Sequence, residues 1–127
     1  MKLGYTDCKV FEFVSRMDYA YAVADLVVAR AGAISVSELC LVQLPAILVP
    51  LPTAAEDHQT KNARALTDRG AAVLVKDDRA VEDLGKEIIR LIGDASELAK
   101  LRTAVASMGQ QNAAEAIAVE VIRLARA

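Results

Sequence analysis

The feature that most constrains the fold is a series of short apolar runs, rich in β-branched residues, separated by stretches with helical spacing. An apolar run without a polar face is typical of a strand that is buried on both sides, as in a parallel sheet. Strands that alternate with helices along a chain predict βαβ units. The predicted strands are Val10–Val14, Asp25–Ala29, Ala46–Val49 and Ala72–Val75. The expected fold class is therefore α/β with a parallel sheet.

The stretches between and after these runs have the residue pattern of helices. Leu84, Ile88, Leu91 and Ile92 recur at helical spacing and predict one buried stripe. Gly70 is suited to the C-terminal cap of the helix that precedes it. The predicted helices are Met17–Ala24, Val36–Val42, His58–Arg69, Val81–Ile92, Ala95–Met108 and Asn112–Ala127.

Composition narrows the classes of function. The 127 residues suffice for one domain, and the net charge of -2 comes without any basic tract. Binding to nucleic acid or to anionic membranes through bulk charge therefore has little support. Cys8 and Cys40 are too few for a disulfide framework and have no metal spacing, so a reduced, cytoplasmic chain is expected. The most apolar run, Leu39–Leu51, is too short and too broken by prolines to span a bilayer.

The segment from Arg30 to Glu38 has two readings. In the first, a strand ends, Gly32 turns the chain, and the free N–H groups of the following helix form a cradle for a pyrophosphate. Glu38, one turn later, could then accept hydrogen bonds from both hydroxyls of a ribose. In the second, Ser35 and Glu38 form a capping box at the start of the helix. Arg30 could contact a phosphate or pair with a nearby carboxylate.

The segment around His58, Gln59 and Asn62 follows a buried strand and opens the next helix. These side chains could present donors and acceptors to the hydroxyls of a sugar, or they could simply form a solvated helix start. His58 is the only histidine, so no metal cluster is expected. Both this segment and the one from Arg30 follow strands at the carboxyl edge of the predicted sheet, where ligands bind in open parallel sheets.

Residues Arg30–Glu38 resemble the nucleotide-sugar loop of the MurG family of undecaprenyl-diphospho-muramoylpentapeptide β-N-acetylglucosaminyltransferases. The pattern Gly-Ala-x-Ser/Thr-x-x-Glu, with its spacing to Leu-Pro-x-x-x-Val-Pro at Leu44–Pro50, is specific to this family and its close relatives. The similarity includes Asp57–Ala63 and covers nearly the whole chain from about Val10.

The resemblance implies part of a GT-B glycosyltransferase that binds UDP-N-acetylglucosamine, with no metal and no cofactor. Residues 1–127 would be the C-terminal portion of its donor-binding domain, a partial Rossmann-like, doubly wound sheet without its first strands. Ala33, Ile34 and Ser35 would lie against the diphosphate, and Glu38 would hold the ribose. The expected donor site comprises Phe13, Val14, Arg30, Gly32, Ala33, Ile34, Ser35, Glu38, His58, Gln59 and Asn62.

Within that site, Phe13 and Val14 would border the uracil and Gln59 would recognise the N-acetylglucosamine hydroxyls. Family members carry a pair of glutamines at the last place, whereas the first position here is His58.

The same resemblance implies an inverting transfer of N-acetylglucosamine onto the lipid-linked muramoylpentapeptide, at the cytoplasmic face of the plasma membrane. This step belongs to peptidoglycan synthesis, and hence to cell shape and cell division. The catalytic base would come from an N-terminal acceptor domain, so this chain alone is expected to be inactive. Two alternatives stay open: a stand-alone donor-binding subunit with a separate membrane-bound partner, and a non-catalytic fragment that dimerises through an open edge at Asp25–Ala29.

Overall fold

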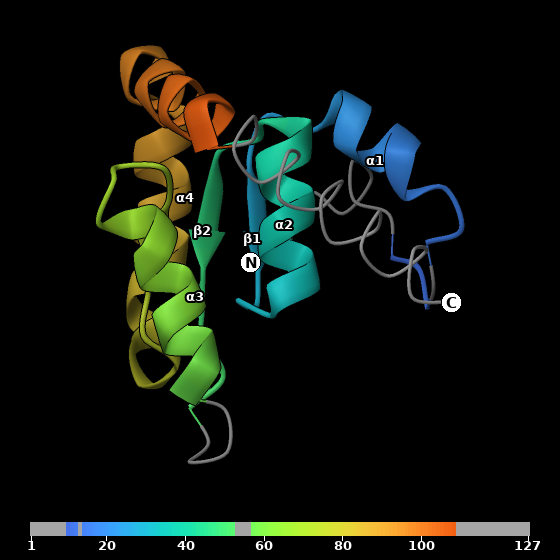
Figure 1. The fold of residues 1–127 in the computed structure, drawn as a ribbon. Coiled ribbons are helices and arrows are strands. Elements are labelled where there is room, and N and C mark those ends of the chain that lie inside the picture. The colour runs from blue at the N-terminus through green and yellow to red at the C-terminus, as the bar shows by residue number, and fades with distance from the viewer. Residues whose placement is uncertain (1–9, 13, 53–56, 109–127) are drawn as a thin grey trace.

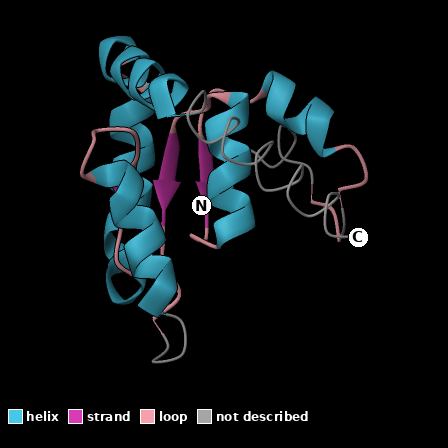
Figure 2. Cartoon of the chain, in the orientation of Figure 1, coloured by secondary structure: helices cyan, strands magenta, loops and turns pink. Residues whose placement is uncertain are grey.

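The computed structural model describes residues 10–12, 14–52 and 57–108. Its centre is a sheet of three parallel strands in the order β1-β2-β3: β1 (Val27–Ala29), β2 (Ala46–Leu48) and β3 (Val73–Leu74). Figure 1 shows β1 and β2 with helices packed around them, and Figure 2 separates the two kinds of element by colour. The predicted α/β class, and three of the four predicted strands, are therefore confirmed, although the strands are shorter than expected.

Helices occupy the segments between and after the strands. They are α1 (Met17–Val23), α2 (Ala33–Val42), α3 (Asp57–Thr67) and α4 (Ala80–Ile92), which follows the short 3-10 helix η3 (Asp77–Arg79). A further helix covers residues 95–108. These confirm the predicted helices, except that α2 begins three residues earlier than the predicted Val36. The predicted helix Asn112–Ala127 lies outside the described residues.

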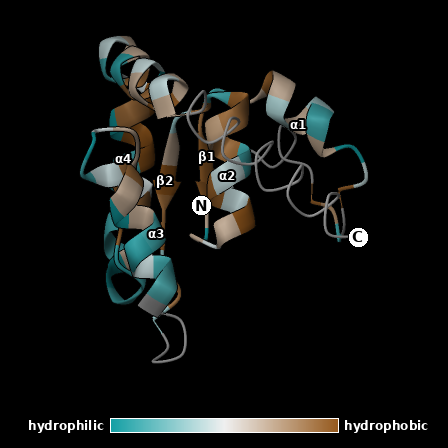
Figure 3. Cartoon of the chain, in the orientation of Figure 1, coloured by the Kyte–Doolittle hydropathy of each residue, from teal (hydrophilic) through white to brown (hydrophobic). Residues whose placement is uncertain are grey.

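Helices cover both faces of the sheet. Alternate residues of its buried strands point to opposite faces, so each face packs against its own helices. Ala46 and Leu48 belong to a cluster that includes Leu39 of α2 and Leu66 of α3. Ile47 belongs to the opposite cluster, with Leu91 of α4. Figure 3 shows apolar β1 and β2, and among the neighbouring helices α3 is mostly hydrophilic whereas α2 is largely apolar.

One position of the predicted apolar stripe on α4 is wrong. Leu84, Ile88 and Leu91 pack in the cluster that includes Ile47, but the side chain of Ile92 is 64% exposed. The buried stripe of α4 is therefore narrower than predicted, and Ile92 lies outside it.

The predicted strand Val10–Val14 is also wrong within the described residues. Residues 10–12 and 14 have no strand structure, and Val10 and Phe11 are 91% and 62% exposed. An extended segment becomes a strand only when a neighbour satisfies its backbone groups. The described sheet gives it no such neighbour, because its three strands pair only with one another.

The turn after α3 confirms the predicted role of Gly70. This residue has a positive φ of 69°, the left-handed conformation that glycine adopts without strain. The Ala71 N–H donates to the Leu66 carbonyl at 2.9 Å, which is the long bond of a Schellman motif. Ala71 and Leu66 are both buried, and β3 begins two residues later at Val73.

Candidate functional site at the carboxyl edge of the sheet

The two segments singled out in the sequence lie at the same edge of the sheet. The loop after β1 leads into α2, and the loop after β2 leads into α3. Parallel strands place their carboxyl ends at one edge, so the first turns of α2 and α3 both begin there. The structure thus brings the Arg30–Glu38 and His58–Asn62 segments together, as predicted.

The first turn of α2 differs from the predicted capping box. The helix begins at Ala33 with Gly32 as its N-cap, and no side chain caps it. Ser35 therefore lies inside the first turn and cannot act as the N-cap, so the capping-box reading is wrong. The sequence misleads here because glycine at an N-cap gives a weaker signal than serine. The amides of Ala33, Ile34 and Ser35 are the first three of the helix, which have no acceptor within the helix itself.

Gly32 leaves open space in front of these amides. A Cβ atom built on Gly32 would meet no atom within 4 Å. Its φ of -64° and ψ of 151° suit any residue, so the backbone conformation does not require glycine. Neither the backbone conformation nor the packing therefore requires glycine at this position.

Glu38 lies on α2 one turn beyond this terminus and is exposed to solvent. Its Oε2 accepts a hydrogen bond of 2.8 Å from the Tyr21 hydroxyl of α1. Partial burial raises the pKa of the Tyr21 hydroxyl, and the hydrogen bond to Glu38 and the negative charge of its carboxylate raise this pKa further. Tyr21 was not among the predicted site residues. No short-range signal points to it, because it lies 17 residues from its partner.

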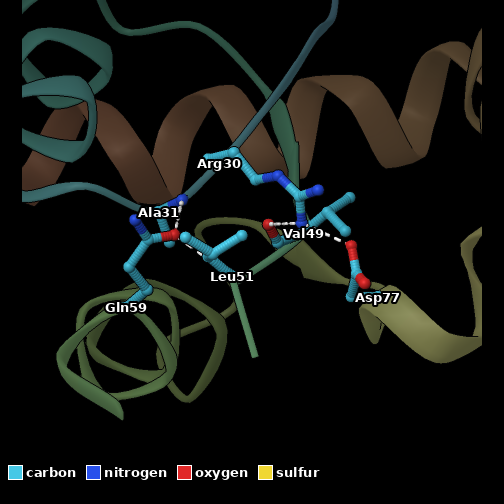
Figure 4. Close-up of polar contacts among 6 residues, drawn as sticks. All are labelled: Arg30, Ala31, Val49, Leu51, Gln59 and Asp77. Atoms are coloured by element: carbon cyan, nitrogen blue, oxygen red, sulfur yellow. Dashed lines mark hydrogen bonds and ion pairs between the residues drawn. The ribbon is translucent and has the colours of Figure 1, made fainter. Parts of the chain in front are cut away.

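Two carboxamides of α3 hold the loop that precedes α2, and Figure 4 shows the one of Gln59. Gln59 Oε1 accepts hydrogen bonds from the Ala31 N–H at 3.3 Å and the Leu51 N–H at 2.9 Å. Asn62 Nδ2 donates to the Ala31 carbonyl at 3.0 Å. Both polar backbone groups of the fully buried Ala31 are thus satisfied from α3. Gln59 and Asn62 are therefore half-buried and bind backbone groups of the loops. The alternative prediction, that these two residues simply form a solvated helix start, is wrong.

Arg30 joins the ends of all three strands (Figure 4). Its Nη1 donates to the Val49 carbonyl at 3.3 Å and pairs with the Asp77 carboxylate, which lies just after β3. Of the two partners that the sequence left open for Arg30, a phosphate or a carboxylate, the structure shows the carboxylate. The side chains of Arg30 and Asp77 are 50% and 34% exposed, so this pair contributes little more than about 1 kcal/mol to stability.

The other predicted site residues are less closely engaged. Ile34 is 77% exposed at the start of α2, and His58 is exposed on α3. Val14 lines a cavity of about 470 Å³ together with Phe11 and Tyr19, while Phe13 lies outside the described residues. Within the described ranges, no group of histidine, cysteine and carboxylate side chains could hold a metal ion. None of the helices in those ranges is long and apolar enough to cross a membrane.

Comparison with known proteins identifies relatives for this architecture. Residues 2–117 match the glycosyltransferase family 28 C-terminal domain. A protein of Porphyromonas gingivalis strain W83 is 51% identical over 92% of the chain, and one of Bacteroides thetaiotaomicron is 47% identical over 93%. Both are named UDP-N-acetylglucosamine--N-acetylmuramyl-(pentapeptide) pyrophosphoryl-undecaprenol N-acetylglucosamine transferase. The chain spans about a third of their length, 31% and 32% respectively.

A solved structure shows the same arrangement of elements. The crystal structure of Acinetobacter baumannii MurG superposes with a TM-score of 0.67 and 32% sequence identity, over 80% of this chain and 28% of that one. The three-stranded parallel sheet and its flanking helices thus correspond to one part of a larger glycosyltransferase.

Proposed function

The chain belongs to the glycosyltransferase family 28 C-terminal domains, and we propose that it is the donor-binding part of an N-acetylglucosaminyltransferase. The donor would be UDP-N-acetylglucosamine, the first substrate in the names of the relatives. It would bind at the carboxyl edge of the sheet, without a metal or a cofactor. The fold supports this proposal, because ligands of open parallel sheets bind outside the carboxyl ends of the strands.

The observation that carries the proposal is the uncapped start of α2 at this edge. The helix begins at Ala33 without a capping side chain, and a Cβ atom added at its N-cap, Gly32, would meet no atom within 4 Å. The first amides, with the positive end of the helix dipole, suit the two negative charges of a diphosphate. Glu38 lies one turn further and offers a carboxylate to the ribose hydroxyls. A nucleoside diphosphate matches this arrangement, because its charged diphosphate is followed by the diol of its ribose.

The remaining roles follow from the hydrogen-bonding groups that each side chain does not already use in the contacts described above. The carbonyl oxygen of Gln59 is occupied by two backbone N–H groups, so Gln59 would recognise sugar hydroxyls only through its amide nitrogen. Asn62 and Arg30 would act mainly by fixing the loops, since both already bind backbone carbonyls. Exposed His58 and Ile34 would border the sugar and the diphosphate. Phe13 and Val14 would border the uracil.

For the whole protein, we propose transfer of the sugar onto undecaprenyl-diphospho-muramoylpentapeptide in peptidoglycan synthesis, at the cytoplasmic membrane face. The acceptor hydroxyl would attack the sugar carbon directly and UDP would leave, so the configuration inverts. A general base must take the proton of that hydroxyl. By the family resemblance, that base would come from the acceptor domain. The 127-residue chain alone should therefore show no transfer, and measurable turnover by it would contradict this assignment.

The ribose role of Glu38 gives the central test. Two hydrogen bonds to a charged acceptor are worth about 1.5–3 kcal/mol each, so Glu38→Ala should weaken UDP binding by roughly one to three decades. Binding is measured by amide chemical-shift changes of the chain on titration with UDP, which detects weak complexes. Glu82→Ala on α4 serves as the control, because it removes an exposed carboxylate on the other side of the sheet. Unchanged affinity in Glu38→Ala would refute the ribose role, and no shifts at millimolar UDP would refute donor binding by this chain.

A second candidate role is self-association through β1. This strand lies at one edge of the described sheet, and Val28 on it is 42% exposed. An exposed apolar edge strand invites pairing with a further strand. A mass that stays above monomer on dilution would favour this role, and a monomer at all concentrations would exclude it.

A further inference from the structure

We propose that Tyr21 is a positioning residue for the donor: its hydroxyl holds the Glu38 carboxylate in the orientation that binds the ribose diol. This inference rests on the proposed donor-binding function. It concerns a residue of α1, a helix that contributes none of the donor contacts proposed above. The hydrogen bond between Tyr21 and Glu38 Oε2, at 2.8 Å, is the contact that carries it.

The argument begins with the position of Glu38. Its side chain is exposed, and a free glutamate side chain has several rotatable bonds that water leaves unrestrained. Ordering such a side chain on binding costs conformational entropy. Tyr21 can reduce this cost because its own ring is fixed: it packs against the core cluster that also contains Leu39 of the same helix α2. The carboxylate is thereby attached to a rigid aromatic side chain before any ligand arrives.

The hydrogen-bonding capacity of the carboxylate leaves room for the ligand. A carboxylate has about four acceptor positions, and the phenol takes one of them on Oε2. Oε1 and the second acceptor position of Oε2 remain for two ribose hydroxyls. A cis-diol needs two acceptors at a fixed separation and angle, so its binding depends on the orientation of the carboxylate and not only on its charge.

The same contact has little effect on folding. The hydrogen bond lies at the exposed surface, so water can replace the phenol when it is removed. Tyr21→Phe retains the ring that packs on the core and removes only the hydroxyl. A purely structural role for the hydroxyl would therefore alter stability, whereas a positioning role alters diol recognition.

The experiment compares UDP with its 2′-deoxyribose analogue on the wild-type chain, Tyr21→Phe, Glu38→Gln and the double variant. Glu82→Gln is the matched control for Glu38→Gln, because it neutralises an exposed carboxylate of α4 on the other side of the sheet. Tyr21→Phe should weaken UDP binding about three- to tenfold, the size of one ordinary hydrogen bond. It should weaken binding of the deoxy analogue less, so the preference for the full diol falls. In the double variant, the loss of the hydroxyl should add nothing to the loss from Glu38→Gln.

The outcomes separate this inference from the function on which it rests. If Glu38→Gln weakens binding while Tyr21→Phe leaves affinity and diol preference unchanged, the positioning role is overturned and donor binding stands. Tighter binding in Tyr21→Phe would also overturn it, since the phenol would then compete with the ribose. If Glu38→Gln itself has no effect although UDP still binds, the ribose role of Glu38 and the positioning role of Tyr21 fail together, while donor binding stands.

Discussion

Replacing Gly32 by aspartate should make the chain more stable and a poorer receptor for UDP at the same time. Gly32 has the extended backbone that N-cap residues adopt, and an added Cβ would meet no atom within 4 Å. The introduced carboxylate can therefore accept from the Ile34 or Ser35 N–H without strain. Capping, the helix dipole and the loss of glycine flexibility in the unfolded chain together favour Gly32→Asp by about 1 kcal/mol.

The same carboxylate should occupy the amides that we propose bind the diphosphate, and it adds a like charge beside them. Loss of even one charge-assisted hydrogen bond, worth about 1.5–3 kcal/mol, weakens UDP binding by at least about tenfold. Urea unfolding measures the gain: with a slope of about 1–2 kcal/mol per molar, the midpoint should rise by roughly 0.5–1 M. Titration with UDP measures the loss.

Two further variants make this result interpretable. Gly32→Ser adds an uncharged cap, so it should stabilise the helix with a smaller loss of affinity. Gly85→Asp places the same charge on α4, at another open glycine, and should leave UDP binding unchanged. A Gly32→Asp chain that is stabilised yet binds UDP as well as wild type would refute the amide cradle. A Gly32→Asp chain that is destabilised would refute the position of the N-cap.

Three further outcomes are expected. Gln59→Met should lower the free energy of unfolding by about 1–3 kcal/mol, because the buried Ala31 N–H loses its acceptor. Gln59→Glu keeps an acceptor oxygen, so its free energy of unfolding should fall much less in the same urea assay. Arg30→Gln should cost under about 1 kcal/mol, with a difference from wild type that shrinks in high salt, because its ion pair is half-exposed. The pKa of Tyr21 is raised from its ordinary value of 10.0, so its stabilising contribution is complete below pH 10.0 and is lost as pH rises through the raised pKa. Tyrosine absorbance should then show a late-titrating component that Tyr21→Phe removes and Tyr19→Phe does not.

Patterns that depend on neighbouring residues were predictable from the sequence. The continuous apolar run at Ala46–Leu48 and the glycine at the end of α3 both had their expected roles. Each rests on local chemistry: a strand buried on two sides must be apolar, and a left-handed cap favours glycine. The placement of two polar segments at one sheet edge followed from the same strand pattern.

Features that depend on distant partners were not predictable. The run at Val10–Val14 has strand composition, but pairing decides whether it becomes a strand. The spacing of Ser35 and Glu38 suited a capping box, yet α2 begins earlier and Glu38 meets Tyr21 of another helix. The loop contacts of Gln59 span 8 and 28 residues along the chain, so no local pattern contains them.

The two carboxamides of α3 have a consequence for how this edge can move. Because Gln59 and Asn62 hold the peptide groups of Ala31, and Gln59 also holds Leu51, any tilt of α3 is passed directly to the approach of α2. The first turn of α3 and the loop that precedes α2 should therefore not loosen independently. A ligand that stiffens one of them should slow hydrogen exchange at the other, even where it makes no contact there.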